Sequence, residues 1–326
     1  MEKLRVAVIG AGAFGRNHLR VVSRSEGATL AAVVDADAAR AAAAAAEFGC
    51  PAVELVDVPA RADAAIVAVT TSAHAEVGCR LLEAGLDVLV EKPIAGDLPS
   101  ARRLVDTAHA RGRILQVGHL ERFNPAVTAL KRILTVPLFF EVHRLSVFTP
   151  RSLDVDVVLD LMIHDLDILL DLAGQAPEEI RAAGISILSP RVDIANVRLA
   201  FPNGCIANLT ASRVSTERVR KLRVFQPRQY VSLDYARQEA AVFEVSQARE
   251  IGCRMLPVEK DEPLKLELAS FLEAVRRRRE PVASGEDGYR ALEVALAILD
   301  RIEEHSRVVA QSLAAWSTAA RSPARG

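Results

Sequence analysis

The chain has 326 residues, half of them hydrophobic, so it can bury cores for two domains. Its 41 Lys and Arg balance 42 Asp and Glu, and a formal net charge of −1 argues against nucleic acid or anionic membrane as its main partner. The four cysteines lack metal-ligand spacing and no apolar run is long enough to cross a membrane, so we expect a cytoplasmic protein with reduced thiols and no metal.

Residues 4–9 form a compact apolar run that predicts a buried strand, and a helical pattern follows after a glycine-rich turn. In G-x-G-x-x-G, the first glycine permits the tight turn, the second lets main-chain amides approach a pyrophosphate, and the third lets the helix pack on the strand. The positive end of that helix then faces the phosphates. The predicted cofactor-binding residues of this turn are Gly10, Gly12, Ala13, Phe14 and Gly15.

The stretch "LAAVVDAD" predicts a second strand, which ends at Asp35, twenty residues after Gly15. A carboxylate at this offset accepts hydrogen bonds from the ribose 2′- and 3′-hydroxyls and repels a 2′-phosphate, so NAD is favoured over NADP. The alternative is that Asp35 only caps the next helix. That helix is predicted over the alanine-rich residues 38–46, which Phe48 and Gly49 follow as a stop signal.

Two more strands end in polar segments, within "DAAIVAVTTSAHAEV" and "AGLDVLVEKPIA". Strands that alternate with helices indicate a parallel, right-handed sheet, and ligands of such sheets bind beyond the carboxyl ends of the strands. The residues expected at that edge, beside the cofactor, are Thr70, Thr71, His74, Glu91 and Lys92.

With "GAGAFG", "VTTSAHAEV" and "VEKP" in this order, nearly the whole chain resembles the glucose-fructose oxidoreductase / inositol dehydrogenase (Gfo/Idh/MocA) family. The resemblance implies an α/β fold: a Rossmann domain, residues 1–121, and a substrate-binding and oligomerisation domain, residues 122–326, of α+β type with an open, mostly antiparallel sheet. It also implies NAD(P)-dependent oxidation of a sugar or cyclitol hydroxyl. The roles of the family's catalytic lysine and Asp-x-x-x-His pair fall on Lys92, Asp160 and His164.

The pattern of the remaining chain agrees with such a second domain. "VGHLERF" reads as the last strand of the first domain, "NPAVTALKRIL" as a connecting helix and "LFFEVHRLSV" as a strand. A helix over about residues 154–173 is followed by extended runs with turn signals, which favour an antiparallel sheet, and a helix-rich tail starts near residue 263. Because an open sheet usually needs covering, we expect a homodimer or homotetramer.

The helix over residues 154–173 carries a narrow polar stripe on an otherwise apolar surface. The stripe is either the wet face of an amphipathic helix or a working surface. The cofactor site favours a division: Asp160 and His164, one turn apart, face the chemistry, whereas Asp167 and Asp171 face solvent. Asp165 lies off the stripe and is expected to be a structural hydrogen-bonding residue.

The reaction removes a proton from a secondary hydroxyl while its carbon gives a hydride to the nicotinamide. Histidine is the best-tuned general base near neutral pH, so His164 is assigned as base, and Asp160 orients it or the sugar. Lys92 would stabilise the developing alkoxide, or act as the base itself if burial lowers its pKa. The sequence leaves this division of labour open.

Three stretches, "QVGHLERFNPAV", "RSLDVDVVLDLMIHDLDI" and "SRVSTERVRKLRVF", resemble the nucleotide-sugar branch of the family, particularly enzymes that oxidise the 3-hydroxyl of UDP-N-acetylglucosamine. A substrate pyrophosphate suits the fork of arginine. The candidate substrate-binding residues are Arg122, Phe123, Asn124, Arg151 and Arg213, although each arginine alone also fits a structural role. The alternatives for the whole chain are a free-sugar or inositol dehydrogenase and a regulator that binds NAD and sugar without turnover.

Overall fold

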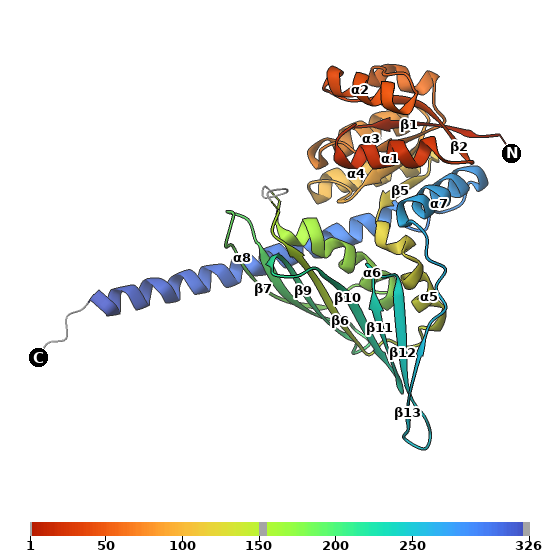
Figure 1. Ribbon diagram of the computed structural model, residues 1–326. Helices are drawn as coiled ribbons and strands as arrows, with labels where there is room; N and C mark the ends of the chain where they lie inside the picture. Colours follow the sequence, from red (N-terminus) through yellow and green to blue (C-terminus); the bar gives the residue numbers. More distant parts are fainter. Residues whose placement is uncertain (1, 150–154, 322–326) are drawn as a thin grey trace, which may run out of the picture. The chain divides into compact units, whose positions relative to one another are not determined.

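The computed structural model describes residues 2–149 and 155–321, and side chains as far as Gln311. The chain divides into two units, Met1–Thr128 with Val258–Leu292 and Ala129–Pro257 with Glu293–Gly326 (Figure 1). The first unit therefore also contains Val258–Leu292, a segment from late in the sequence. A single boundary between residues 121 and 122, as predicted, assigns that segment to the second domain.

The first unit contains a five-stranded parallel sheet of order β2-β1-β3-β4-β5, so the predicted Rossmann-type α/β architecture is confirmed. Its strands are β1 (Leu4–Ile9), β2 (Ala28–Val34), β3 (Ala64–Val67), β4 (Asp87–Glu91) and β5 (Leu115–Gly118). The connecting helices are α1 (Ala13–Ser23), α2 (Ala38–Phe48), η1 (Leu55–Ala60), η2 (Thr71–Ala73), α3 (His74–Glu83) and α4 (Leu98–Arg111). The strands β3, β4 and β5 are buried along their whole length, as expected for a parallel sheet that helices cover on both faces.

After β5 the chain forms η3 (Leu120–Phe123) and α5 (Pro125–Ile133), so the strand predicted across "VGHLERF" ends at Gly118. The segment that returns to the first unit begins with α7 (Pro263–Arg277), which packs against α1. Leu268 and Phe271 of α7 share a buried apolar cluster with Val6 of β1 and Leu19 of α1. Burial of such side chains stabilises by about 1.5–3 kcal/mol each, so α7 is an integral part of this core.

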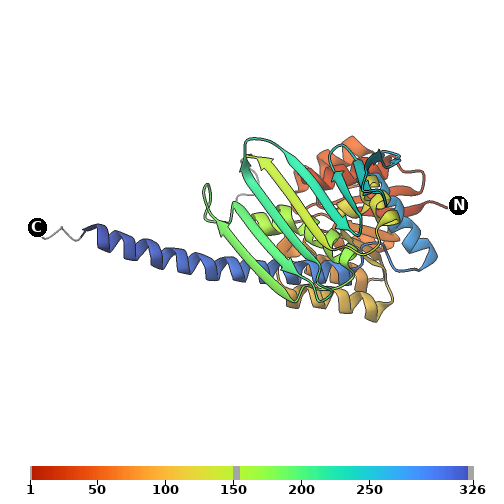
Figure 2. The same cartoon turned by 90° about the horizontal axis from the view of Figure 1, so that it is seen from below.

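The second unit contains an eight-stranded sheet of order β13-β12-β11-β10-β6-β9-β8-β7, in which only β6 and β9 pair in parallel (Figure 2). The predicted, mostly antiparallel second sheet is therefore confirmed. Its strands are β6 (Phe139–Val147), β7 (Glu179–Ile185), β8 (Ile194–Ala200), β9 (Ile206–Ser215), β10 (Val219–Gln226), β11 (Gln229–Asp234), β12 (Glu239–Val245) and β13 (Ile251–Met255). The helical elements are η4 (Val158–Met162), α6 (Ile163–Ala173) and, from Glu293 on, the long α8 (Gly285–Arg321), whose first residues belong to the first unit.

The strands of the second sheet alternate buried and half-exposed side chains, so the sheet has one covered and one open face. On β6, Phe140, Val142 and Arg144 point to the covered face. The open face carries a row of half-exposed aromatic rings from four neighbouring strands, with centroids 4.4–5.8 Å apart: Phe139, Phe225, Tyr230 and Phe243.

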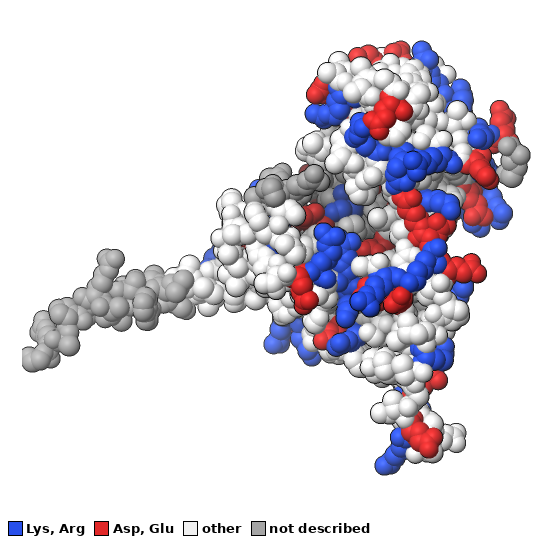
Figure 3. Space-filling model, viewed as in Figure 1, with Lys and Arg blue, Asp and Glu red and all other residues white. Residues whose placement is uncertain are grey.

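On the face drawn in Figure 3, cations and anions lie side by side rather than as a field of one sign. In residues 2–149 and 155–321, each helix is too short or too polar to cross a membrane. All four cysteines are free thiols; Cys50, Cys79 and Cys205 are buried and Cys253 is exposed.

Candidate active site

The glycine-rich turn after β1 has the geometry that a dinucleotide phosphate needs. Gly10 has φ +100°, and a Cβ there would lie 2.4 Å from the Ala68 carbonyl oxygen, while a Cβ on Gly15 would lie 1.8 Å from the Gly10 carbonyl oxygen. At these two positions the backbone therefore leaves space only for glycine. A Cβ on Gly12 meets no protein atom within 4 Å, so Gly12 leaves open space at the N-terminus of α1. The turn fits NAD, because a pyrophosphate binds main-chain amides at such a helix start.

Asp35 lies next to this turn at the carboxyl end of β2. Its carboxylate accepts hydrogen bonds from the main-chain N–H of Ala11 (2.7 Å) and of Asp37 (2.9 Å), and its side chain is only 7% exposed. The cap of α2 is Asp37, which accepts hydrogen bonds from the N–H groups of Ala39 and Arg40 at 3.0 and 3.1 Å. The helix-capping alternative for Asp35 is therefore wrong, and the ribose role predicted for Asp35 is compatible with its position.

The Glu-Lys-Pro segment forms a turn at the carboxyl end of β4. Glu91 accepts a hydrogen bond from the main-chain N–H of Lys92 at 3.2 Å, and the Lys92–Pro93 peptide is cis. Lys92 is half-buried, as are Thr71 and the turn residue Gly12, whereas Thr70 and Phe14 are exposed. The predicted cofactor residues thus lie at the carboxyl ends of β1 to β4, the edge where parallel sheets bind ligands.

The buried ring of His74 contacts this turn through one nitrogen and Val69 through the other. Its Nδ1 lies 2.9 Å from the Pro93 carbonyl oxygen and its Nε2 lies 3.2 Å from that of Val69, and the residue is 1% exposed. Burial lowers the pKa of His74, although the two carbonyls and the Glu91 charge act in the opposite direction. A neutral ring donates from one nitrogen, and the shorter contact favours Nδ1. The protein itself therefore occupies both ring nitrogens of this predicted cofactor ligand.

In the second unit, Asp160 lies in the π-helical turn η4 and His164 in the first turn of α6. Both are partly exposed, and the Asp160 N–H donates to the Asp156 carbonyl oxygen at 3.0 Å. Single π-helical turns inside helices often occur at functional sites. The two predicted catalytic residues are thus accessible, and they lie on one short helical segment.

The stripe beyond His164 differs from its prediction. Asp167 is 1% exposed, so the expectation that it faces solvent is wrong. His164 and Asp167 both lie in the regular helix α6, so their angular spacing is as expected, and Asp167 is buried because the face that it occupies packs inside the protein. Asp171 is half-buried, and its carboxylate lies 2.6 Å from the Lys131 ammonium.

Asp165 has the structural role that was predicted for it. Its carboxylate accepts two hydrogen bonds from the Arg144 guanidinium, at 2.5 and 2.9 Å, and both residues are at most 2% exposed. The Tyr235 ring lies 5.1 Å from the Arg144 guanidinium carbon. The ion pair joins α6 to β6 directly beside His164. Arg144 has no local sequence signal, because its partner is distant along the chain.

The described candidate substrate residues, Arg122, Phe123, Asn124 and Arg213, lie on both units and contact other protein groups. Arg122 donates to the Val282 carbonyl oxygen at 3.1 Å and lies 3.5 Å from the Asp287 carboxylate. Asn124 bonds Glu121 and the Ala126 N–H at the start of α5, and Phe123 is buried. Arg213 donates to the Val155 carbonyl oxygen and lies 3.7 Å from Asp193. Arg151 falls outside the described residues. Contact with substrate stays a prediction for all five candidates.

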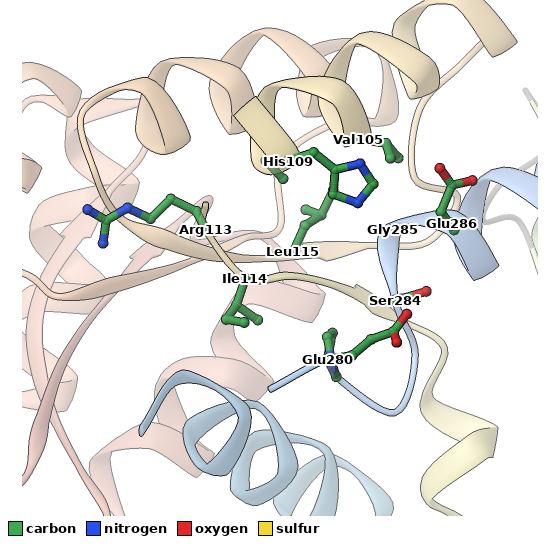
Figure 4. A pocket seen from close by; sticks show the side chains of 11 residues that line it. Val105, His109, Arg113, Ile114, Leu115, Glu280, Ser284, Gly285 and Glu286 are labelled. Atoms are coloured by element: carbon green, nitrogen blue, oxygen red, sulfur yellow. The ribbon is translucent and has the colours of Figure 1, made fainter. Parts of the chain in front are cut away.

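A pocket of about 340 Å³ lies elsewhere in the first unit, between α4, the start of β5 and residues 280–286 (Figure 4). His109, Arg113, Glu280 and Glu286 line it. Because Arg113 precedes the amino end of β5, this pocket lies at the sheet edge opposite the carboxyl ends of the strands. It is therefore separate from the predicted cofactor site.

Comparison with known proteins defines the class. Residues 4–119 match the oxidoreductase family with an NAD-binding Rossmann fold, and residues 134–229 match the GFO/IDH/MocA C-terminal domain. The chain belongs to the Gfo/Idh/MocA oxidoreductase family. It is an NAD-dependent dehydrogenase that acts on CH–OH groups.

Its relatives include two kinds of enzyme. UDP-N-acetylglucosamine 3-dehydrogenase from Acidithiobacillus ferrooxidans is 35% identical over 310 residues, 93% of this chain and 98% of the relative. A solved structure of that enzyme superposes with a TM-score of 0.88, covering 93% of this chain and 99% of that one. Inositol 2-dehydrogenase from Rhizobium meliloti is 26% identical over 94% of this chain and 98% of its own.

Proposed function

We propose that this dehydrogenase oxidises a secondary hydroxyl of a nucleotide sugar, namely C3 of UDP-N-acetylglucosamine, to give the 3-keto sugar. The supporting observation is the likeness to the Acidithiobacillus ferrooxidans enzyme, which is 35% identical over 93% of the chain, whereas three inositol dehydrogenases that match over 94% of the chain are 26%, 27% and 30% identical. The nucleotide-sugar stretches of the sequence favour the same substrate.

In this proposal His164 takes the hydroxyl proton, Asp160 orients His164 or the sugar, and Lys92 donates a hydrogen bond to the oxygen as it becomes an alkoxide. NAD, when bound, accepts the hydride that leaves the same carbon. Two observations support these roles: His164 is accessible on a helix that the buried Arg144–Asp165 pair fixes, and Lys92 ends a strand at the ligand-binding edge of its sheet.

Recognition of the UDP moiety is assigned to Arg122, Phe123, Asn124, Arg151 and Arg213. A guanidinium presents its N–H donors in a fork that suits a pyrophosphate, and this shape supports the assignment of Arg122 and Arg213. The proposal also includes a cytoplasmic homodimer or homotetramer, because the aromatic row on the open face of the second sheet is half-exposed in a single chain.

A second candidate is an inositol or free-sugar dehydrogenase, which the match to the Rhizobium meliloti enzyme over 94% of the chain favours. A regulator that binds NAD and sugar without turnover is the third. The presence of Lys92, Asp160 and His164 together argues for chemistry over sensing.

The test follows NADH absorbance with UDP-N-acetylglucosamine, UDP-glucose, free N-acetylglucosamine and myo-inositol, with and without 2-oxoglutarate in case bound cofactor recycles. We expect kcat/KM for UDP-N-acetylglucosamine to exceed that for the free polyols by at least about tenfold, roughly 1.4 kcal/mol of transition-state binding. Preference for myo-inositol would replace the proposal with the second candidate, and no turnover of any sugar would favour the regulator.

The catalytic roles are tested with His164→Ala and Lys92→Ala, alone and combined. We expect each to lower kcat by about 10²-fold or more. His109→Ala is the matched control, since His109 lines the separate pocket of Figure 4. Hydride transfer retained by the double variant would overturn the assignment.

A further inference from the structure

Helix α7 brings a carboxyl group into the first unit that has no evident partner. Glu267 is 1% exposed, and neither carboxyl oxygen has a hydrogen-bond partner in the part of the chain that the structure describes. Two other polar groups lie close to this carboxyl, namely the Glu91 carboxyl and the His18 imidazole. One ligand atom from each of the three groups lies within 4.8 Å of the others. His18 and Glu91 are also buried, at 1% and 7% exposure.

The protonation state of Glu267 follows from these surroundings. Two buried carboxylates side by side repel each other, and an ionised Glu267 would have no donor for any lone pair. Burial raises the pKa of Glu267 well above its ordinary value, and the charge of Glu91 raises it further. A proton on Glu267 removes the second charge and supplies the missing donor.

We propose that Glu267 carries a proton and donates it in a hydrogen bond to Glu91, so that His18, Glu91 and Glu267 form a buried trio that positions the Glu91–Lys92 end of β4. Glu267 and His18 are thus positioning residues. Their effect on turnover rests on the proposed function of Lys92. The protonation of Glu267 is independent of that function.

The trio acts on Lys92 through Glu91. One Glu91 oxygen lies 2.6 Å from His18 Nε2, and the other accepts the Lys92 main-chain N–H at 3.2 Å. A Cβ on Gly118 of β5 would lie 2.8 Å from that second oxygen, so the space beside it is closed. A third contact, from Glu267, leaves the carboxylate little freedom. The main chain at Lys92 is then held in place with it.

Other charged groups near α7 already have partners. Neighbouring β5 contributes the uncharged Gln116, whose amide donates to the Glu267 carbonyl oxygen at 3.3 Å. The element η3 contributes Glu121 and Arg122, which bond Asn124 and Val282. On α1, Arg20 pairs with Glu262. Glu91 and His18 are the titratable groups whose ligand atoms lie within 4.8 Å of a Glu267 carboxyl oxygen in the described residues.

A divalent cation is the competing occupant, because an imidazole and two carboxylates are suitable ligands. The distance of 2.6 Å between His18 Nε2 and the Glu91 oxygen argues against it. Two ligands of a tetrahedral metal at about 2.0–2.1 Å lie about 3.3 Å apart, so the observed separation is that of a hydrogen bond.

The test compares wild type with Glu267→Gln and Glu267→Leu in the full-length protein. Infrared spectra at neutral pH should contain the carbonyl band of a protonated carboxylic acid, which both variants lose. Gln donates a permanent N–H to Glu91, so Glu267→Gln should keep kcat within a few-fold of wild type. For wild type we expect kcat to decline at high pH, where Glu267 ionises, and Glu267→Gln should lack this decline. Glu267→Leu removes the donor, and we expect kcat to fall on the order of 10²-fold with little change in KM for NAD.

If the wild-type spectrum lacks the acid band, the proposal that Glu267 is protonated is wrong. If the purified protein contains a stoichiometric metal, the trio is a cation site instead. Wild-type kcat in Glu267→Leu would overturn the positioning role. If Glu267→Leu does not fold, the pH profile of Glu267→Gln still decides, because an unchanged upper limb contradicts the proposal. The infrared test needs no substrate, so failure of the nucleotide-sugar assay leaves it intact.

Discussion

Arg144 of β6 and Asp165 of α6 form a two-point ion pair, with donor-acceptor distances of 2.5 and 2.9 Å, inside the second unit. Both side chains are at most 3% exposed, and Asp165 directly follows His164 in the sequence. The helix that carries the proposed base is thereby fixed to the sheet at its first turn. An interaction that is nearly fully buried and bidentate is costly to break, because the remaining partner becomes an unpaired buried charge.

Replacing Arg144 with Met therefore should lower the free energy of unfolding by about 3–5 kcal/mol, since Asp165 remains without its cation. In the fraction that folds, kcat should drop more than the KM for NAD rises, because His164 loses its orientation. Urea unfolding and steady-state kinetics measure the two effects. Arg181→Met, which breaks an exposed pair with Glu179, is the control and should change stability by less than about 1 kcal/mol. If the two substitutions lower the free energy of unfolding equally, the buried pair contributes no more to stability than the exposed one.

The glycine turn allows a second comparison. Gly15→Ala places a Cβ 1.8 Å from the Gly10 carbonyl oxygen, so the turn must shift and the variant should fold poorly. Gly12→Ala meets no protein atom within 4 Å, so its melting temperature should stay near that of wild type. Its methyl group would instead project toward the pyrophosphate, and we expect weaker NAD binding by about tenfold or more. Calorimetric titration with NAD, alongside thermal melts, checks both; unchanged NAD affinity in Gly12→Ala would remove this turn from the cofactor site.

The preference for NAD over NADP should depend on Asp35. Asp35→Ser removes the charge that repels a 2′-phosphate, so the ratio of kcat/KM for NAD to that for NADP should fall by at least about tenfold. Asp37→Ser is the matched control because Asp37 caps α2 through Ala39 and Arg40, and serine is itself a good cap. The control should leave the cofactor ratio unchanged. A shift of the ratio in the control but not in Asp35→Ser would transfer the specificity role to Asp37.

Local patterns predicted the first unit well. The apolar run at residues 4–9, the glycine turn and the alanine-rich helix are features in which neighbouring residues determine the backbone, and they form β1, α1 and α2. The second sheet was also predictable, because turn signals separate the extended runs that form its strands. The family resemblance, rather than any periodicity, identified Lys92, Asp160 and His164.

Long-range contacts and irregular turns were not predictable in this way. Nothing in the neighbourhood of Glu267 indicates that α7 returns it to His18 and Glu91, which lie far from it in the sequence. Arg144 and Asp165 likewise meet only through the tertiary fold. Asp167, expected in solvent, is buried because its face of α6 packs inside the fold, and the turn before His164 is a π turn that no local pattern indicates. Periodicity assumes regular geometry, and here the irregular turn coincides with the proposed catalytic residues.

The last prediction concerns His74, whose ring holds the Lys92–Pro93 turn in its neutral form. Burial lowers its folded pKa from the ordinary value of 6.5, so the unfolded chain takes up a proton first as the pH falls below about 6.5. Stability that is present above that pH is then lost, with a slope of at most about 1.4 kcal/mol per pH unit, until the folded protein also titrates. Compared with wild type, His74→Gln should show a shallower loss of unfolding free energy between about pH 7 and pH 5 in urea titrations. His109→Gln, an exposed histidine replaced in the same way, should keep the wild-type slope. If His74→Gln also keeps it, another group causes the acid sensitivity, and folding does not lower the pKa of His74.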